Sequence, residues 1–113
     1  MSQITTHVLD TAIGKPAEGV PITLHRSIGN DQWEKIAYGV TNSDGRISTL
    51  LPSTTYLSPG VYRMLFETKG YFERQKIKAF YPYVNIVFEI YDREHYHMPL
   101  LVSPFGYSTY RGS

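Results

Sequence analysis

Alternation of apolar and polar residues, in short runs separated by turn signals, is the feature that most constrains this chain. Successive side chains of a β-strand point to opposite faces, so such a run predicts a strand with one buried face. The clearest run is Tyr83–Tyr91, which places Val84, Ile86, Phe88 and Ile90 on one face. We therefore expect a protein built from sheets.

Other runs with the same period recur, and the ten tyrosines and many Thr, Val and Ile residues suit pleated, half-buried surfaces. The candidate helix, Lys69–Lys78, is short and contains the poor helix former Gly70. Seven or eight short strands at fairly regular intervals favour an all-β sandwich. Besides the clearest run, strands are expected at Ile4–Asp10, Pro21–Arg26, Trp33–Val40 and Val61–Thr68, after Gly45, and on both sides of the Ser103–Gly106 turn.

Glycine, proline and asparagine mark the connections between these strands. Gly29–Asp31 and Asn42–Gly45 predict tight turns, and in the second turn Gly45 can take the positive φ that other residues resist. Gly14–Pro16 and Leu50–Ser58 are interpreted as loops. Pro99 removes a donor from its strand, which predicts that this strand lies at a sheet edge or carries a local irregularity.

Length and composition narrow the class of protein. The 113 residues suit a single domain, residues 1–113, with a substantial core. Because 42% of residues are hydrophobic, 19% are charged and the net charge is +1, neither disorder nor nucleic-acid binding is indicated. The absence of cysteine excludes disulfides and thiol catalysis. We see no membrane-spanning run, no signal peptide and no Ser-Lys-Leu ending, so we expect a cytoplasmic protein.

Most polar groups able to do chemistry are gathered in residues 95–113. Strand alternation puts His95 and His97 on one face, and it puts Ser108 and Tyr110 on one face of the run past the turn. Terminal residues usually fray, but this tail is aromatic and cationic. We therefore expect the end of the chain to be docked on the rest of the fold.

Histidine is the usual general acid or base at neutral pH, because it titrates at about pH 6.5. Of the four histidines, His25 is interpreted as an outward residue of an ordinary strand. The spacing of His95 and His97 occurs in zinc sites, although a third ligand such as His7 would be needed. We assign no metal and no cofactor, and a metal-dependent hydrolase using these three histidines remains an alternative.

Two arginines differ from the solvated majority. Arg46 follows a tight turn that fixes its backbone, and Arg111 follows Tyr110 in an otherwise apolar run. The planar fork of either could hold a carboxylate or stabilise an oxygen that gains charge in a transition state. Because neither a Gly-x-Ser-x-Gly elbow nor a phosphate-binding glycine loop is present, activation of water by imidazole is the favoured chemistry.

Several motifs together resemble the 5-hydroxyisourate hydrolases, the transthyretin-related enzymes of uric acid breakdown. These motifs, which span nearly the whole chain, are Thr6–Asp10, Gly14–Ala17, Gly19–Pro21, Asp44–Arg46, His95–Leu101, Ser103–Thr109 and Tyr110–Ser113. The terminal Tyr-Arg-Gly-Ser is the most specific, because it separates the hydrolases from transthyretin proper, the hormone carrier of the same fold.

The resemblance implies a transthyretin-like (prealbumin-like) β-sandwich of two four-stranded sheets, with one short helix after the fifth strand. It also implies a homotetramer, a dimer of dimers, whose central channel holds the sites. It assigns catalysis to His7, Arg46 and His97 and leaves His95 as a supporting residue. Substrate contact is expected from His7, Arg46, Ser108, Tyr110, Arg111, Gly112 and Ser113.

Alternation gives an expectation that does not depend on the family. If the strands that carry them belong to one sheet, one surface is lined by His7, Leu9, His97, Pro99, Leu101, Ser108 and Tyr110. Two imidazoles, a phenol and an apolar floor suit a flat purine-like ring. A second copy facing this surface would cover its apolar area and bring in groups from another chain.

The reaction implied is opening of 5-hydroxyisourate at a ring amide, which gives 2-oxo-4-hydroxy-4-carboxy-5-ureidoimidazoline. In this hypothesis one of His7 and His97 takes a proton from water while Arg46 stabilises the ring oxygen. The main alternative is a transthyretin-like carrier of small aromatic ligands without catalysis, which predicts loss of the histidines and of the terminal tetrapeptide. A sandwich module for protein association is the remaining alternative, and it leaves the clustered polar groups unexplained.

Overall fold

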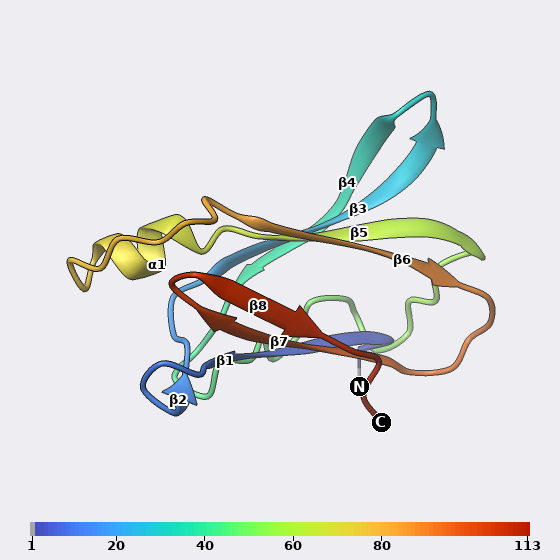
Figure 1. Cartoon of the computed structure of the whole chain (residues 1–113). Helices are drawn as coiled ribbons and strands as arrows, with labels where there is room; N and C mark the ends of the chain where they lie inside the picture. The colour runs from blue at the N-terminus through green and yellow to red at the C-terminus, as the bar shows by residue number, and fades with distance from the viewer. Residues whose placement is uncertain (1) are drawn as a thin grey trace.

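Two sheets face each other in the computed structural model, which describes residues 2–113 (Figure 1). One sheet has the strand order β2-β1-β7-β8 and the other β4-β3-β5-β6. The elements are β1 (Ile4–Asp10), β2 (Lys15–Pro16), β3 (Pro21–Gly29), β4 (Gln32–Val40), β5 (Gly60–Phe66), α1 (Lys69–Glu73), β6 (Val84–Ile90), β7 (Tyr96–Ser103) and β8 (Gly106–Thr109). The expected sandwich of two four-stranded sheets with one short helix is confirmed.

Alternation works as expected in most strands. Along β1 every second residue is buried, and Ile4 and Val8 enter the space between the sheets. They meet Leu24 of β3, Tyr62 of β5 and other fully buried side chains. Each fully buried large apolar side chain stabilises the fold by about 1.5–3 kcal/mol, so this layer holds the two sheets together.

Strands β1 and β7 are the one parallel pair, and they lie side by side in the middle of their sheet (Figure 1). Their register runs from Ile4 opposite Tyr96 to Asp10 opposite Val102. Parallel neighbours need a long crossover, and here the crossover is the whole second sheet. The pairing therefore joins the beginning of the chain to residues near its end.

Pro99 lies in β7, which has β1 on one side and β8 on the other, so the expectation of an edge strand was wrong. The alternative expectation, a local irregularity, is confirmed. Leu100 is paired with Thr109, and β8 ends there. The next contact is a single bridge between His97 and Gly112, so the ladder is interrupted where Pro99 lacks a donor.

The helix is shorter than the expected Lys69–Lys78 and ends at Glu73. Lys76 takes a positive φ of 58°, and the N–H of Ile77 donates to the carbonyl of Phe72 at 3.0 Å, a helix-terminating arrangement. The buried Tyr71 donates its hydroxyl to Asp10 at 2.7 Å. Burial and this bond raise the pKa of Tyr71 to about 12, so α1 stays anchored to the end of β1.

Two short segments differ from expectation. Lys15–Pro16, interpreted as loop, forms the two-residue strand β2 against the end of β1. Arg46, expected to begin a strand, makes only one isolated bridge, to His7. Lys15–Pro16 therefore lies beside the end of β1, and Arg46 lies beside its middle.

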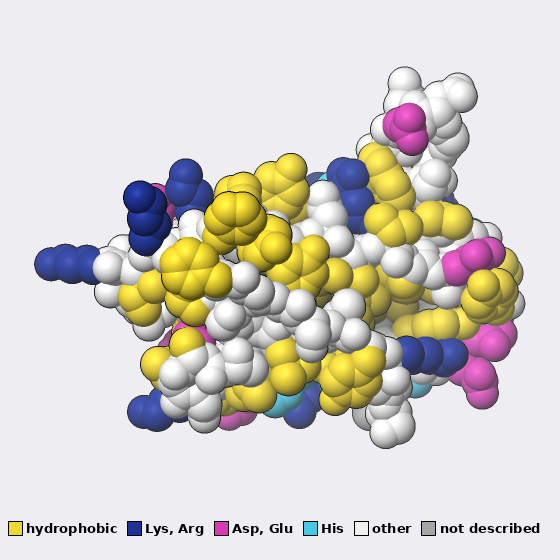
Figure 2. All heavy atoms as spheres, viewed as in Figure 1, with side chains coloured by type: hydrophobic (Ala, Val, Ile, Leu, Met, Phe, Trp, Pro, Cys, Tyr) yellow, Lys and Arg dark blue, Asp and Glu magenta, His cyan; other side chains and the backbone are white. Residues whose placement is uncertain are grey.

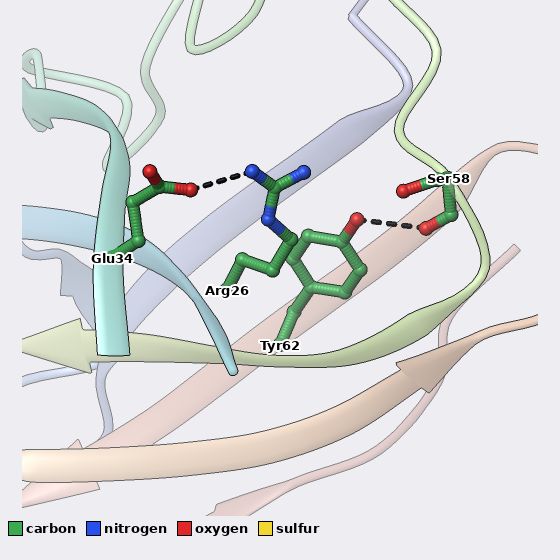
Figure 3. Close-up of polar contacts among 4 residues, drawn as sticks. All are labelled: Arg26, Glu34, Ser58 and Tyr62. Atoms are coloured by element: carbon green, nitrogen blue, oxygen red, sulfur yellow. Dashed lines mark hydrogen bonds and ion pairs between the residues drawn. The ribbon is translucent and has the colours of Figure 1, made fainter. Parts of the chain in front are cut away.

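The hairpin of β3 and β4 turns at Asn30 and Asp31, as the turn signal predicted, and both residues have positive φ. An ion pair between Arg26 and Glu34 links the two strands, while the Tyr62 hydroxyl donates to the Ser58 carbonyl nearby (Figure 3). Water screens the exposed ion pair, so it adds little to stability. Within the described residues, no helix is long and apolar enough to cross a membrane.

Candidate functional site

The outer face of β1 and β7 carries the histidines. In β1 the side chains of Thr5 and His7 are partly exposed between buried neighbours, and in β7 His97 is likewise partly exposed. The parallel register sets Thr5 opposite His97 and His7 opposite Pro99. The expectation that His7 and His97 share one surface is confirmed for these two strands.

A tight turn brings Arg46 to this face. Asn42 organises the turn, because its side-chain oxygen accepts the N–H groups of Asp44 at 2.9 Å and Arg46 at 3.2 Å. Gly45 has a φ of 74°, and its carbonyl accepts the N–H of Val8 at 2.8 Å. A Cβ atom at Gly45 would lie 2.4 Å from the Val8 carbonyl oxygen, so the turn can dock this closely only with glycine.

Docking of this turn places the Arg46 guanidinium beside the His7 ring. Its Nη2 lies 3.5 Å from His7 Nδ1. Both side chains are accessible from solvent, so a ligand can reach them. An imidazole and a planar cation therefore meet at one point although they are 39 residues apart.

Thr5 joins the other two histidines. Its hydroxyl oxygen lies 2.7 Å from His95 Nε2 and 2.8 Å from His97 Nδ1. The two rings are stacked with centroids 6.2 Å apart and an interplanar angle of 26°. His95 thus belongs to the same cluster as His97, as strand alternation indicated.

His97 has a pKa below its ordinary value. Burial is the largest cause, and the positive charges of Arg46, His95 and His7 act in the same direction, against a smaller opposing contribution from Thr5. The folded protein therefore favours neutral His97 at neutral pH and for some distance below. A neutral imidazole has a lone pair with which it can accept a proton.

The carboxyl-terminal tail is docked, as expected. The N–H of Gly112 donates to the His97 carbonyl at 2.8 Å, and a Cβ atom at Gly112 would lie 2.7 Å from His97 Cδ2. The guanidinium of Arg111 packs 4.1 Å from the centre of the Tyr96 ring and donates to the His95 carbonyl at 3.3 Å. The tail therefore closes one side of the histidine cluster.

The other expected site residues lie at the margin of this cluster. Tyr110 is 60% exposed and, with Arg111, lines a pocket of about 290 Å³ between the tail and β6. Ser108 is exposed on β8 opposite Leu101, and Ser113 is exposed at the end of the chain. No side-chain hydrogen bond among residues 2–113 links Ser108, Tyr110 or Ser113 to an imidazole.

Sequence reasoning missed Thr5 and Asn42. Thr5 precedes His7 by two residues, so alternation does put both on one face, but only the parallel register reveals that His97 lies opposite Thr5. Asn42 was seen as part of a turn, and its paired contacts to Asp44 and Arg46 are what fix the arginine. Within the described part of the chain, no three His, Asp or Glu side chains form a group that could hold a metal ion.

This arrangement is suited to acid–base chemistry on a polar ring. A neutral imidazole can remove a proton from water, and a guanidinium within reach can stabilise the oxygen that gains charge. The apolar side chain of Leu101 extends the same face of β7 and could pack against a flat ligand. The geometry therefore supports hydrolysis at a carbonyl.

Comparison with known proteins agrees with hydrolysis. The profile of the HIUase/Transthyretin family matches residues 4–112. A 5-hydroxyisourate hydrolase of Salmonella typhimurium is 45% identical over 111 residues, which cover 97% of this chain and 80% of that protein.

Solved structures of both kinds share the fold. The 5-hydroxyisourate hydrolase of Klebsiella pneumoniae superposes with a TM-score of 0.84 at 40% identity, covering 97% of this chain and 92% of that one. Sea bream transthyretin in complex with thyroxine gives a TM-score of 0.90 at 32% identity, covering 97% and 94%. Because both superpose well, the overall fold alone does not separate the two functions. The match of sequence and structure over nearly the whole length shows that this chain belongs to the HIUase/Transthyretin family.

Proposed function

We propose that this chain hydrolyses 5-hydroxyisourate in urate degradation and that the product is 2-oxo-4-hydroxy-4-carboxy-5-ureidoimidazoline. The enzymatic activity rests on the family match and on relatives named as 5-hydroxyisourate hydrolases at about 45% identity. The observation that best supports a site for it is the convergence of His7, Arg46 and His97 on one face. We take these three as the catalytic residues.

In the proposed mechanism His97 is the general base. Its lowered pKa keeps a lone pair available at neutral pH, so it can take a proton from water as the water oxygen adds to the ring carbonyl carbon. Arg46 stabilises the carbonyl oxygen as it becomes negative. His97 then returns the proton to the ring nitrogen as the carbon–nitrogen bond breaks, and His7, beside Arg46, orients the attacking water.

The tail and Ser108 are proposed to bind the substrate. Gly112 lies against the His97 ring, so the ligand can come close to the imidazole without meeting a side chain there. Tyr110, Arg111, Ser113 and Ser108 line the margin of the cluster, where they could hold the ureido and carbonyl groups of the ring. A ligand held between the histidine cluster and these marginal residues would be contacted on more than one side, which suits a flat heterocycle.

We further propose that the chain assembles as a homotetramer, a dimer of dimers, from a single domain of residues 1–113. Hydrophobic side chains gather on the face over β6, β8 and the loop after α1 (Figure 2), and large aromatic residues such as Phe80, Phe105 and Tyr107 are exposed. Burial of such patches against further copies is a common reason for symmetric assembly. A second copy would also enclose the open histidine face.

A ligand carrier remains the second candidate, because sea bream transthyretin, solved with thyroxine, shares the backbone. The carrier function gives no reason for His7, Arg46 and His97 to meet, whereas hydrolysis does. A carrier would bind the ring compound without changing its rate of decay. The two functions therefore differ in one measurable quantity.

The test is ultraviolet absorbance of freshly made 5-hydroxyisourate with and without the purified protein. Loss of the substrate signal should be much faster than spontaneous decay, and deletion of residues 110–113 should reduce the acceleration strongly while the far-ultraviolet spectrum stays that of a β protein. An unchanged decay rate with intact protein would reject the hydrolase. Full activity of the deletion variant would reject the role of the tail.

A further inference from the structure

We propose that Thr5 is a positioning residue that couples the protonation patterns of His95 and His97, so that His97 presents its lone pair at Nε2. The inference deepens the proposed function, because water activation by His97 needs a ring nitrogen free of both hydrogen and protein partner. Thr5 and His95 would thus take part without touching the reacting atoms.

The contacts leave one nitrogen of His97 available. Nδ1 is 2.8 Å from the Thr5 hydroxyl, and Cδ2 lies on the side where Gly112 packs. Within the described residues, Nε2 has no hydrogen-bond partner. The ring is therefore held at one edge by Thr5 and confined beside Gly112, with Nε2 directed to neither.

The number of hydrogens on the hydroxyl limits the possible patterns. A threonine hydroxyl has one hydrogen to donate, and here it has two imidazole nitrogens within 2.8 Å. When both rings are neutral, the hydroxyl can donate to at most one of the two nitrogens, while its oxygen can accept an N–H from either ring or from both. Hence the two Thr5-facing nitrogens cannot both lack a hydrogen if both contacts are hydrogen bonds.

Three arrangements meet this condition, and the two in which His97 Nδ1–H donates to Thr5 give a base. If the Thr5 hydroxyl donates to His97 Nδ1, the hydrogen of His97 sits on Nε2, which then cannot accept a proton. If His97 Nδ1–H donates to Thr5 and Thr5 donates to His95 Nε2, the lone pair of His97 is at Nε2. If both rings donate to Thr5, its hydroxyl hydrogen has no partner among these three side chains, whereas the second arrangement pairs it with His95. We therefore assign the second arrangement to the resting enzyme, with His95 carrying its hydrogen on Nδ1.

His95 is placed to hold that pattern. Its side chain is exposed, and the Arg111 guanidinium holds its backbone carbonyl. The charged or titratable groups that influence His97 from neighbouring elements are Arg46, His95 and His7, and all three favour its neutral form. These groups favour a neutral His97, and within residues 2–113 Thr5 is the side chain that hydrogen-bonds both rings.

The direct test uses nuclear magnetic resonance of protein with ¹⁵N- and ¹³C-labelled histidine at pH 8, which lies above the ordinary histidine pKa of about 6.5. Native protein should show His97 as the Nδ1–H tautomer. The isosteric Thr5→Val variant, which cannot hydrogen-bond, should shift His97 to a mixture or to the Nε2–H tautomer. Thr6→Val is the matched control, because Thr6 lies on the opposite face of the same strand and bonds only the Met98 carbonyl. An unchanged His97 tautomer in Thr5→Val would overturn the inference.

Kinetics supply the second readout. Thr5→Val should lower kcat about 10- to 100-fold with little change in KM, because the substrate contacts remain while the base is in the wrong form for much of the time. Thr5→Ser should restore most of the rate, since it keeps the hydroxyl. Equal rates for Thr5→Val and native protein, or no recovery with Thr5→Ser, would contradict the coupling.

The outcome can be separated from failure of the proposed function. If native protein does not accelerate 5-hydroxyisourate decay but the tautomer of His97 still depends on Thr5, the hydrolase proposal fails and the coupling stands. If the enzyme is active and the tautomer of His97 does not depend on Thr5, only the coupling proposal fails.

Discussion

His25 and His97 lie on the outer faces of opposite sheets and resemble each other electrostatically. Burial is the largest cause that lowers the pKa of each ring, and neighbouring positive charge adds to it. The charge comes from Arg63 and Lys35 for His25. For His97 it comes from Arg46 and two histidines. By titration alone either could serve as a base at neutral pH. Only His97 has neighbouring groups with which it could act together on a ligand.

The difference lies in the hydrogen bonds. His25 stands in a cross-strand row between Lys35 and Arg63, and its Nδ1 is buried without a partner. The Arg63 guanidinium packs over the Trp33 ring, 4.4 Å from its centre. His97 has one nitrogen held by Thr5 and the other free. A perturbed pKa therefore marks a functional histidine only where geometry agrees.

The sharpest contrast comes from removing each ring. His97→Asn should lower kcat for 5-hydroxyisourate by about 100- to 10,000-fold, because it removes the proposed general base. His25→Asn should leave the rate within about twofold, since this residue lies in the other sheet and touches no part of the site. The ultraviolet assay measures both, and comparable losses in the two variants would erase the distinction.

The two arginines extend the contrast. Arg46→Ala should reduce kcat by about 100- to 1,000-fold, the usual effect of losing one group that stabilises a developing oxyanion. Arg63→Ala exposes Trp33 and should change its fluorescence without changing turnover. A full rate for Arg46→Ala would remove the arginine from the mechanism.

Gly112 tests how closely the tail must approach His97. Gly112→Ala places a methyl group 2.7 Å from His97 Cδ2, which forces the ring or the tail to move, and kcat should fall about 10- to 100-fold. Gly70→Ala is the control, because nothing lies within 4 Å of the Cβ atom it would add. A crystal structure of the Gly112→Ala protein with an undisturbed His97 ring would show that the contact is dispensable.

The smallest effect concerns acid stability, in which the two histidines should behave alike. Both have lower pKa values folded than unfolded, so below about pH 6.5 the unfolded chain binds more protons and the free energy of unfolding falls as pH falls. His25→Asn and His97→Asn should each make the midpoint of urea unfolding less dependent on pH between about pH 7.5 and 5. A dependence as steep as that of the native protein in both variants would show that neither pKa is lowered.

Much of the fold could be predicted because its strands obey simple alternation. The buried face of β6 and the turns at Asn30 and Gly45 follow from local sequence. The end of the helix at Glu73 did not, because nothing in the sequence requires Lys76 to take a positive φ. Pro99 likewise had two readings, and only the pairing of β7 with both neighbours chose between them.

The sequence predicted which candidate residues share a face better than it predicted their contacts. Alternation assigned His7 and His97 to outer faces, and the Asp-Gly turn singled out Arg46. The contacts of Thr5 depend on a parallel register between segments at opposite ends of the sequence, and no local pattern sets that register. The pocket that Tyr110 lines together with His97 depends on how the tail bends after Thr109, which strand periodicity cannot give.

The parallel pairing of β1 with β7 has a consequence for how the molecule folds. Thr5 and His97 are 92 residues apart, so the cluster forms only after almost the entire polypeptide has closed into a loop. Closing a long loop costs conformational entropy, and contacts between distant parts of the chain slow folding. During refolding the β3–β4 hairpin and its Trp33 can reach their native surroundings early. Turnover should return last, which makes this activity a sensitive reporter of a completed chain topology.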